Sequence, residues 1–172
     1  MTIRDVQADF SYVSGTPAFP IFGAAGTYLL PNSYDTSPLG GYLTELTTAD
    51  TQLSANVNTM RDLGGGDPMW LVVDWITAPN TLTSCRTELI TSASSSMSAP
   101  VVMIDFGVVV IATLVAGYRQ IAKLPRSAAW LQWIGVQIIT AGSTGTTGSV
   151  IAFLAKDVDA VVQGYASGFS IK

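Results

Sequence analysis

The chain has 172 residues, of which only 12% are charged, and its formal net charge is −4 at pH 7. One cysteine and no histidine exclude an internal disulfide and remove the commonest metal ligand and general base, and with them most enzyme templates. The eight lysine and arginine residues are scattered singly, which argues against nucleic acid as a partner. The length suits one compact domain, and the low charge indicates a surface that is partly committed to protein contacts.

The N-terminal stretch is not expected to act as a signal peptide. Arg4, Asp5 and Asp9 interrupt the region where a signal peptide would have an uninterrupted apolar run. We therefore expect synthesis in the cytoplasm.

Residues 1–50 are punctuated by glycine and proline and leave no window long enough for a helix. They are also rich in Phe, Tyr and Leu, so we expect them to lie against a folded surface. The sequence thus predicts an extended N-terminal arm over residues 1–50 and a β domain over residues 51–172. The arm either wraps its own domain or docks on a neighbouring subunit, and both interpretations stay open.

The glycines at 64–66, followed by Asp67-Pro68, predict a turn that leads into an apolar strand from Met69 to Val73. Because this strand has no polar alternation, both of its faces should be covered, as in the centre of a sheet. A phosphate-binding loop is not indicated, because no Lys-Ser or Lys-Thr pair follows and the glycines precede a strand. The preceding residues 51–60 indicate no definite secondary structure.

A turn at Ala78-Pro79-Asn80 leads to a second predicted strand, Leu82 to Ile90. This strand carries Arg86 and Glu88 two positions apart on one face, which is typical of a solvated face or an edge. The serine-rich stretch from Thr91 to Pro100 predicts a flexible surface loop.

The most apolar stretch, Val101 to Tyr118, is about as long as a transmembrane helix. A carboxylate at Asp105 in the bilayer centre would cost about 2.5 to 3.5 kcal/mol, and the β-branched run that follows Gly107 favours strands. We therefore predict two buried strands with a turn at Asp105-Phe106-Gly107 and no membrane span.

The remaining chain continues the pattern of short strands. A short extended piece ends at Leu124, Trp130 to Ile139 form a strand that is apolar on both faces, and Gly142 to Gly148 form a hairpin connection to a partner strand, Ser149 to Ala155. Lys156 to Lys172 are expected to form a short helix or an extended tail. Together the elements predict an all-β fold, a jelly-roll-like antiparallel β-sandwich with an extended N-terminal arm.

The order of several motifs resembles the capsid cement proteins of tailed bacteriophages, most closely the Bordetella-phage-type cement family. The motifs are the turn and strand Asp62-Leu63-Gly64-Gly65-Gly66-Asp67-Pro68-Met69-Trp70-Leu71-Val72-Val73, the strand Leu82 to Ser92, the step Leu124-Pro125, the start Trp130-Leu131-Gln132, and the hairpin Ala141 to Leu154. The resemblance covers roughly residues 52 to 158. The chain departs from the family at residues 1–50, and at Trp130, where the family usually has Arg or Lys.

The resemblance implies a cement (decoration) protein of the virion that binds the outer surface of an icosahedral capsid. Such a protein bridges neighbouring major capsid proteins and stabilises the expanded head, with no catalysis, cofactor or metal. It also implies a homo-oligomer, a dimer rather than a trimer. Aromatic and arginine anchors are the candidate interface residues: Trp70, Trp75, Arg119, Trp130 and Trp133 in the β domain, and Phe19, Phe22 and Tyr28 in the arm. A tryptophan in a strand is, however, more often a core residue than a contact.

Two other functions stay open. Exposed aromatic side chains on a β face would also suit a carbohydrate-binding module. A carboxylate-based glycosidase would need a pair such as Asp62 with Asp67, or Asp157 with Asp159. Asp157 and Asp159 with Asp67 could alternatively ligate calcium, but no loop has the oxygen spacing of a known calcium motif.

Overall fold

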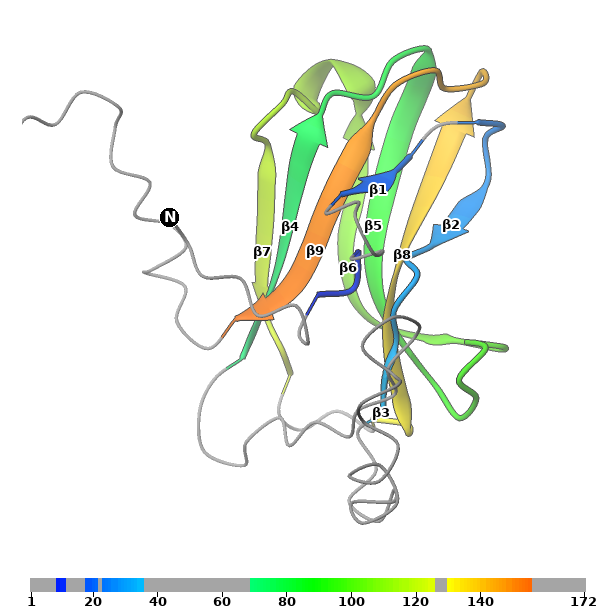
Figure 1. Cartoon of the computed structure of the whole chain (residues 1–172), viewed down its shortest axis with the longest axis vertical. Helices are drawn as coiled ribbons and strands as arrows, with labels where there is room; N and C mark the ends of the chain where they lie inside the picture. The colour runs from blue at the N-terminus through cyan, green and yellow to red at the C-terminus, as the bar shows by residue number, and fades with distance from the viewer. Residues whose placement is uncertain (1–8, 12–17, 22, 36–68, 126–129, 156–172) are drawn as a thin grey trace, which may run out of the picture.

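The computed structural model describes residues 9–11, 18–21, 23–35, 69–125 and 130–155. These residues form two antiparallel β-sheets packed face to face (Figure 1). One sheet has the strand order β1-β9-β4-β7, and the other has the order β2-β8-β5-β6, with β3 also paired to β8. The first strand therefore lies beside the last, and the second beside the last but one, as in a jelly roll. The predicted all-β sandwich is confirmed.

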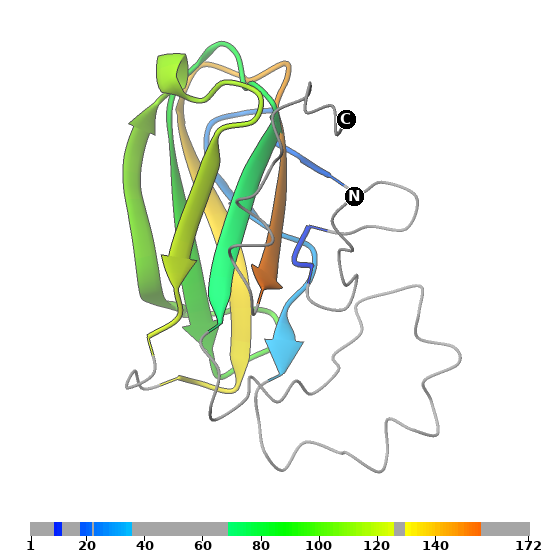
Figure 2. The ribbon, with the colours of Figure 1, turned by 90° about the vertical axis from the view of Figure 1, so that its left-hand side faces the viewer.

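The strands are short or medium in length, as their glycine- and proline-rich connections predict. They are β1 (Phe19–Pro20), β2 (Thr27–Leu29), β3 (Tyr34–Asp35), β4 (Trp70–Thr77), β5 (Leu82–Ser92), β6 (Val101–Val110), β7 (Arg119–Lys123), β8 (Trp133–Gly142) and β9 (Ser149–Ala155). A short 3-10 helix, η3 (Ile111–Thr113), joins β6 to β7. In Figure 2 this side of the sandwich faces the viewer, with β6 and β7, one edge strand from each sheet.

Strand β4 lies in the interior of its sheet, between β9 and β7. Its side chains Leu71, Val73 and Trp75 point into the core and are fully buried, and Val72 on the other face is buried as well. The apolar run without polar alternation therefore becomes a strand covered on both faces, as predicted.

The described residues before position 36 lie against their own sheets. Phe10, Ile21, Leu30 and Tyr34 all belong to the core between the sheets. Residues 9–10 and β1 run along the free edge of β9, and then β2 and β3 pair with β8 in the opposite sheet. Over these residues the chain thus wraps its own domain, which is the first of the two interpretations of the arm.

The connection after β8 is not the hairpin that the sequence predicts. Strand β9 has the predicted bounds, but it pairs with β4 and β1 in the other sheet instead of with β8. Gly148 has a φ of +137°, and a Cβ at this residue would lie 2.8 Å from the carbonyl oxygen of Ile21. A close backbone approach of this kind lets the chain cross between the sheets, and periodicity along one strand does not reveal it.

The side chain of Asn80 fixes this crossing. Its Oδ1 accepts hydrogen bonds from the backbone N–H groups of Thr146 (3.0 Å) and Thr147 (2.8 Å), and its Nδ2 donates to Thr146 Oγ1 (2.7 Å). Asn80 lies in the turn before β5, so one amide group joins the two loops at this end of the sandwich.

Strand β8 begins three residues later than predicted, because the residues before it serve other contacts. Trp130 Nε1 donates to the carbonyl oxygen of Pro125 (3.0 Å), and the Leu131 N–H donates to Thr91 Oγ1 (3.0 Å). Within the strand, Ile134 and Val136 point into the core.

The predicted surface loop from Thr91 to Pro100 agrees with the exposure of most of residues 93–100 but differs from the structure at two places. Thr91 and Ser92 belong to β5 and are buried. Met97 is buried too. Its side chain packs closely on Gly135, where an added Cβ would lie only 2.7 Å from Met97 Cε. The loop therefore folds onto the outward face of β8, where the missing side chain of Gly135 makes room.

Some predictions fall outside the described residues. They concern the glycine turn at 64–66 with Asp67-Pro68, residues 51–60, the tail from 156 to 172, the division of the chain between residues 50 and 51, and the side chain of Phe22. Within the described ranges, no helix has the length and apolar character needed to cross a membrane.

Candidate protein-binding surface

Residues 101–118 do not form the two buried strands predicted from the sequence. They form one long strand, β6, followed by η3. Asp105-Phe106-Gly107 is a β-bulge within that strand, because Arg86 pairs with Val108 and Glu88 with Asp105, so that two residues oppose Thr87. Gly107 has a φ of +77°, and its N–H donates to Asp105 Oδ1 (2.8 Å). The residues that predict a turn therefore serve a bulge.

Strand β6 is also an edge strand, paired only with β5 among the described strands. Its outward valines are largely exposed: 67% of Val108, 57% of Val110 and 45% of Val102 are accessible. Cross-strand pairing places them on the same face as Arg86 of β5 and Leu29 of β2. We call this surface, with Leu29, Val102, Val108 and Val110 as its exposed apolar residues, the aliphatic face.

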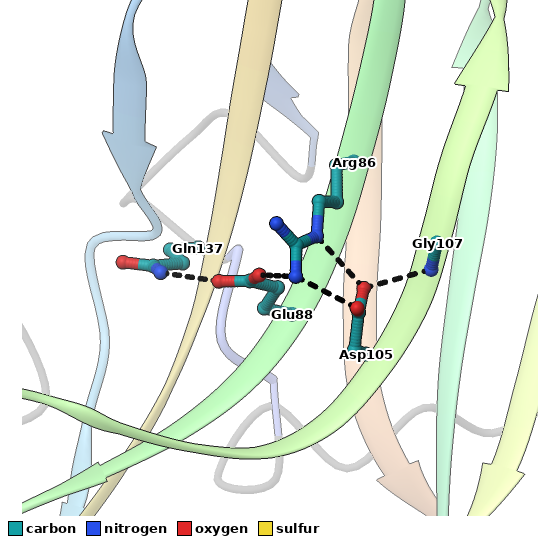
Figure 3. Close-up of polar contacts among 5 residues, drawn as sticks. All are labelled: Arg86, Glu88, Asp105, Gly107 and Gln137. Atoms are coloured by element: carbon teal, nitrogen blue, oxygen red, sulfur yellow. Dashed lines mark hydrogen bonds and ion pairs between the residues drawn. The ribbon is translucent and has the colours of Figure 1, made fainter.

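A network of charged groups occupies the centre of the aliphatic face (Figure 3). Arg86 donates from Nε to Asp105 Oδ1 (2.9 Å) and from Nη2 to Asp105 Oδ2 (2.7 Å), a bidentate contact. The same Nη2 lies 2.9 Å from Glu88 Oε1, and Gln137 Nε2 donates to Glu88 Oε2 (2.6 Å). One guanidinium thus serves two carboxylates, and the network has a formal net charge of minus one.

The two carboxylates differ in their exposure to water. The side chain of Glu88 is only 3% exposed, whereas the side chains of Arg86 and Asp105 are each 39% exposed. Strand β5 is in addition an interior strand, between β8 and β6. The expectation of a solvated face or an edge at Arg86 and Glu88 is therefore wrong for Glu88. Its side chain is covered, and its strand is flanked by a neighbour on each side.

We predict that Asp105 makes stability depend on acid pH. The hydrogen bonds from Arg86, and then the one from the Gly107 N–H, lower the pKa of Asp105 in the folded protein. A lowered folded-state pKa stabilises the fold above the unfolded value, about pH 4, and this contribution is lost as the pH falls through the folded pKa. Urea midpoints measured between about pH 2 and pH 7 should therefore fall less steeply with acid in Asp105→Asn than in the wild type. The same acid slope in both proteins would contradict this role of Asp105.

The outward face of the other sheet has a second bidentate ion pair. Arg119 of β7 donates from Nε and from Nη2 to the two carboxylate oxygens of Asp74 of β4, the second over 2.8 Å. These hydrogen bonds raise the pKa of Arg119. Arg119, a predicted interface anchor, therefore has its charge matched by a residue of its own chain.

The predicted aromatic anchors are buried or half-buried wherever the structure describes them. Trp75 is 0% exposed. Phe19, Tyr28 and Trp130 are partly buried and pack against the core cluster. Trp70 and Trp133 are half-buried, and Phe22 is outside the described residues. The structure therefore does not gather these residues on one accessible surface.

The exposed residues that sequence reasoning missed are the valines of β6. A run such as Val108-Val109-Val110 has no alternation, so periodicity cannot show that one face is open. Only the pairing of β6 with β5 places Val108 and Val110 on the outward face of the sheet while Val109 packs against the core. No signal in the sequence distinguishes these alternatives.

The described residues offer little for catalysis or metal binding. Burial raises the pKa of the Cys85 thiol to about 11, so the group is protonated at neutral pH. Among the residues that the structure describes, no three acidic, cysteine or histidine side chains are grouped as metal ligands would be. The acids considered for a glycosidase or for calcium, at positions 62, 67, 157 and 159, lie outside those residues.

Comparison of the chain with protein-family models and with curated proteins gives no match.

Proposed function

We propose that the protein is a virion structural protein, a capsid cement (decoration) protein of a tailed bacteriophage. In this proposal it binds the outer surface of the icosahedral capsid, bridges neighbouring major capsid protein subunits and stabilises the mature head. It is made in the host cytoplasm and acts as a homo-oligomer, a dimer rather than a trimer, with neither nucleic acid nor membrane as a partner.

The observation that carries this proposal is the aliphatic face. Val108 and Val110 are more than half exposed, on an outward sheet face that also carries Leu29 and Val102. Contact of these aliphatic side chains with water is unfavourable, and a protein partner that covers them removes this cost. The jelly-roll-like fold and the order of the cement-type sequence motifs also support a role in a shell.

The mechanism requires only binding that favours one state. A protein that binds the assembled shell, but not its separated subunits, stabilises the shell by mass action. At a free concentration 100 times Kd the gain is about 2.7 kcal/mol for each site. Because a capsid has many equivalent sites, modest binding at each of them suffices.

Among the residues that the structure describes, the feature that would favour a carbohydrate-binding function is missing. Sugar binding on a β face would use accessible aromatic rings, but all four tryptophans are buried or half-buried. The large hydrophobic side chains that are exposed in the described residues are aliphatic: leucine, isoleucine and valine. The surface therefore favours a protein partner over a glycan.

The proposal is tested with empty phage shells from which the protein has been stripped. We expect the purified protein to co-sediment with these shells in a saturable way and to raise the temperature at which they disrupt. An unrelated acidic protein of similar size is the control for non-specific binding. A protein that stays in the supernatant and leaves the disruption temperature unchanged would contradict the proposal, and a glycan screen would then follow.

A further inference from the structure

We propose that the aliphatic face binds a segment of the shell protein in which aliphatic side chains surround one lysine or arginine, with that cation beside Asp105. This inference rests on the proposed function and adds to it the surface and the chemistry of the partner. A good contact combines a desolvated apolar patch with a few well-placed polar groups, and the aliphatic face has both parts.

The apolar part surrounds the charged network. On β6, Val108 pairs with Arg86 of β5, and Val102 pairs with Ile90, four residues further along β5. On the other side of the network, Leu29 of β2 pairs with Gln137 of β8, which pairs with Glu88. Strand β6 itself has no lysine or arginine to keep a partner away. Because β-branched side chains lose little rotamer freedom on contact, covering them is favourable.

The charged part accepts a cation better than an anion. Asp105 Oδ1 already accepts two hydrogen bonds, from Arg86 and Gly107, but Oδ2 accepts one, from Arg86, and the side chain is 39% exposed. A carboxylate oxygen can accept a further donor, so Asp105 can receive a lysine or arginine from outside. The net negative charge of the network, and the net charge of −4 of the chain, point the same way.

Two other occupants fit this face less well. A second copy placed on it around a two-fold axis would bring two negative networks together, and like charges in a desolvated contact oppose binding. An added strand along the free edge of β6 would need a regular backbone ladder. The pairing of β6 is interrupted by register shifts between Arg86 and Glu88 and between Leu89 and Ile90, and such bulges protect an edge from strand addition.

The apolar part is tested by Val108→Thr and by the double variant Val108→Thr/Val110→Thr. Threonine keeps the β-branched shape and strand propensity but replaces a methyl group with a hydroxyl. In co-sedimentation with stripped shells we expect affinity to fall about fivefold for the single and about 20-fold for the double variant. The matched control is Ile76→Thr, because Ile76 is 47% exposed in β4 of the other sheet. Thermal unfolding should show that all variants fold.

The charged part is tested by Asp105→Asn and by salt. We expect wild-type binding to weaken as NaCl rises from about 0.05 to about 0.5 M, and Asp105→Asn to bind more weakly and with less dependence on salt. If the valine variants and Asp105→Asn bind the shells as strongly as the wild type does, this inference is overturned and the proposed function is left intact. Wild-type protein that does not bind shells at all would overturn both.

Discussion

Replacing Phe10 with alanine should reduce the free energy of unfolding by about 3 to 5 kcal/mol, a large share of the 5 to 15 kcal/mol of a typical domain. Phe10 is 0% exposed in the core, and its ring centroid lies 4.7 Å from that of Tyr34 in an edge-to-face contact. Its N–H donates to the carbonyl oxygen of Ala152 in β9 (2.8 Å). Truncation would therefore leave a cavity between the sheets. Urea unfolding of the full chain measures the loss.

The control for this prediction is Phe19→Ala in β1. Phe19 is only partly buried against the core, so its truncation should cost less. Equal and small losses for both variants would mean that the segment around Phe10 is not integral to the domain. A deletion of the whole N-terminal region would be a poorer test of docking on a neighbour, because it would also remove Ile21, Leu30 and Tyr34 from the core.

Replacing Arg86 with methionine should lower the Tm by about 5 °C, because it removes the cation that neutralises a buried carboxylate. Glu88 is 3% exposed in its side chain, and without Arg86 its contacts would be reduced to the hydrogen bond from Gln137. An uncompensated charge in a covered position is costly, whereas a neutral side chain of the same shape is not. Calorimetry of the variant provides the Tm.

Second substitutions in the Arg86→Met background separate the two carboxylates. Adding Glu88→Gln should recover most of the lost Tm, because the amide can still bond to Gln137 without a charge. Adding Asp105→Asn should recover little, since water already solvates Asp105. An equal recovery from both second substitutions would show that the burial of Glu88 does not cause the loss.

Several elements follow from local patterns that the sequence contains. The apolar run of β4 and the bounds of β9 were both predicted, because period-two alternation and glycine or proline punctuation are local properties. The all-β class follows from the same patterns, since many short strands can bury their apolar faces only by packing two sheets together.

The candidate site was not predicted, because its residues take their exposure from non-local pairing. Val108 and Trp75 are both apolar residues in apolar strands, yet one is 67% exposed and the other 0%. The difference arises because Val108 lies on the outward face of its sheet, whereas Trp75 points into the core between the sheets. Apart from Arg119, the predicted anchors were aromatic residues, and large aromatic side chains such as Trp75 are readily buried in the core.

By itself the sequence determined that this chain is an all-β protein of low charge, without histidine, whose strands are separated by turns. The tertiary structure decided which strands are neighbours and which of them form an edge. It sent β9 to the opposite sheet from β8, placed Phe10 in the core, and turned Asp105-Phe106-Gly107 into a bulge that brings a carboxylate to Arg86. The physical reason is that strand order and register depend on contacts between residues far apart in the chain, so no local pattern specifies them.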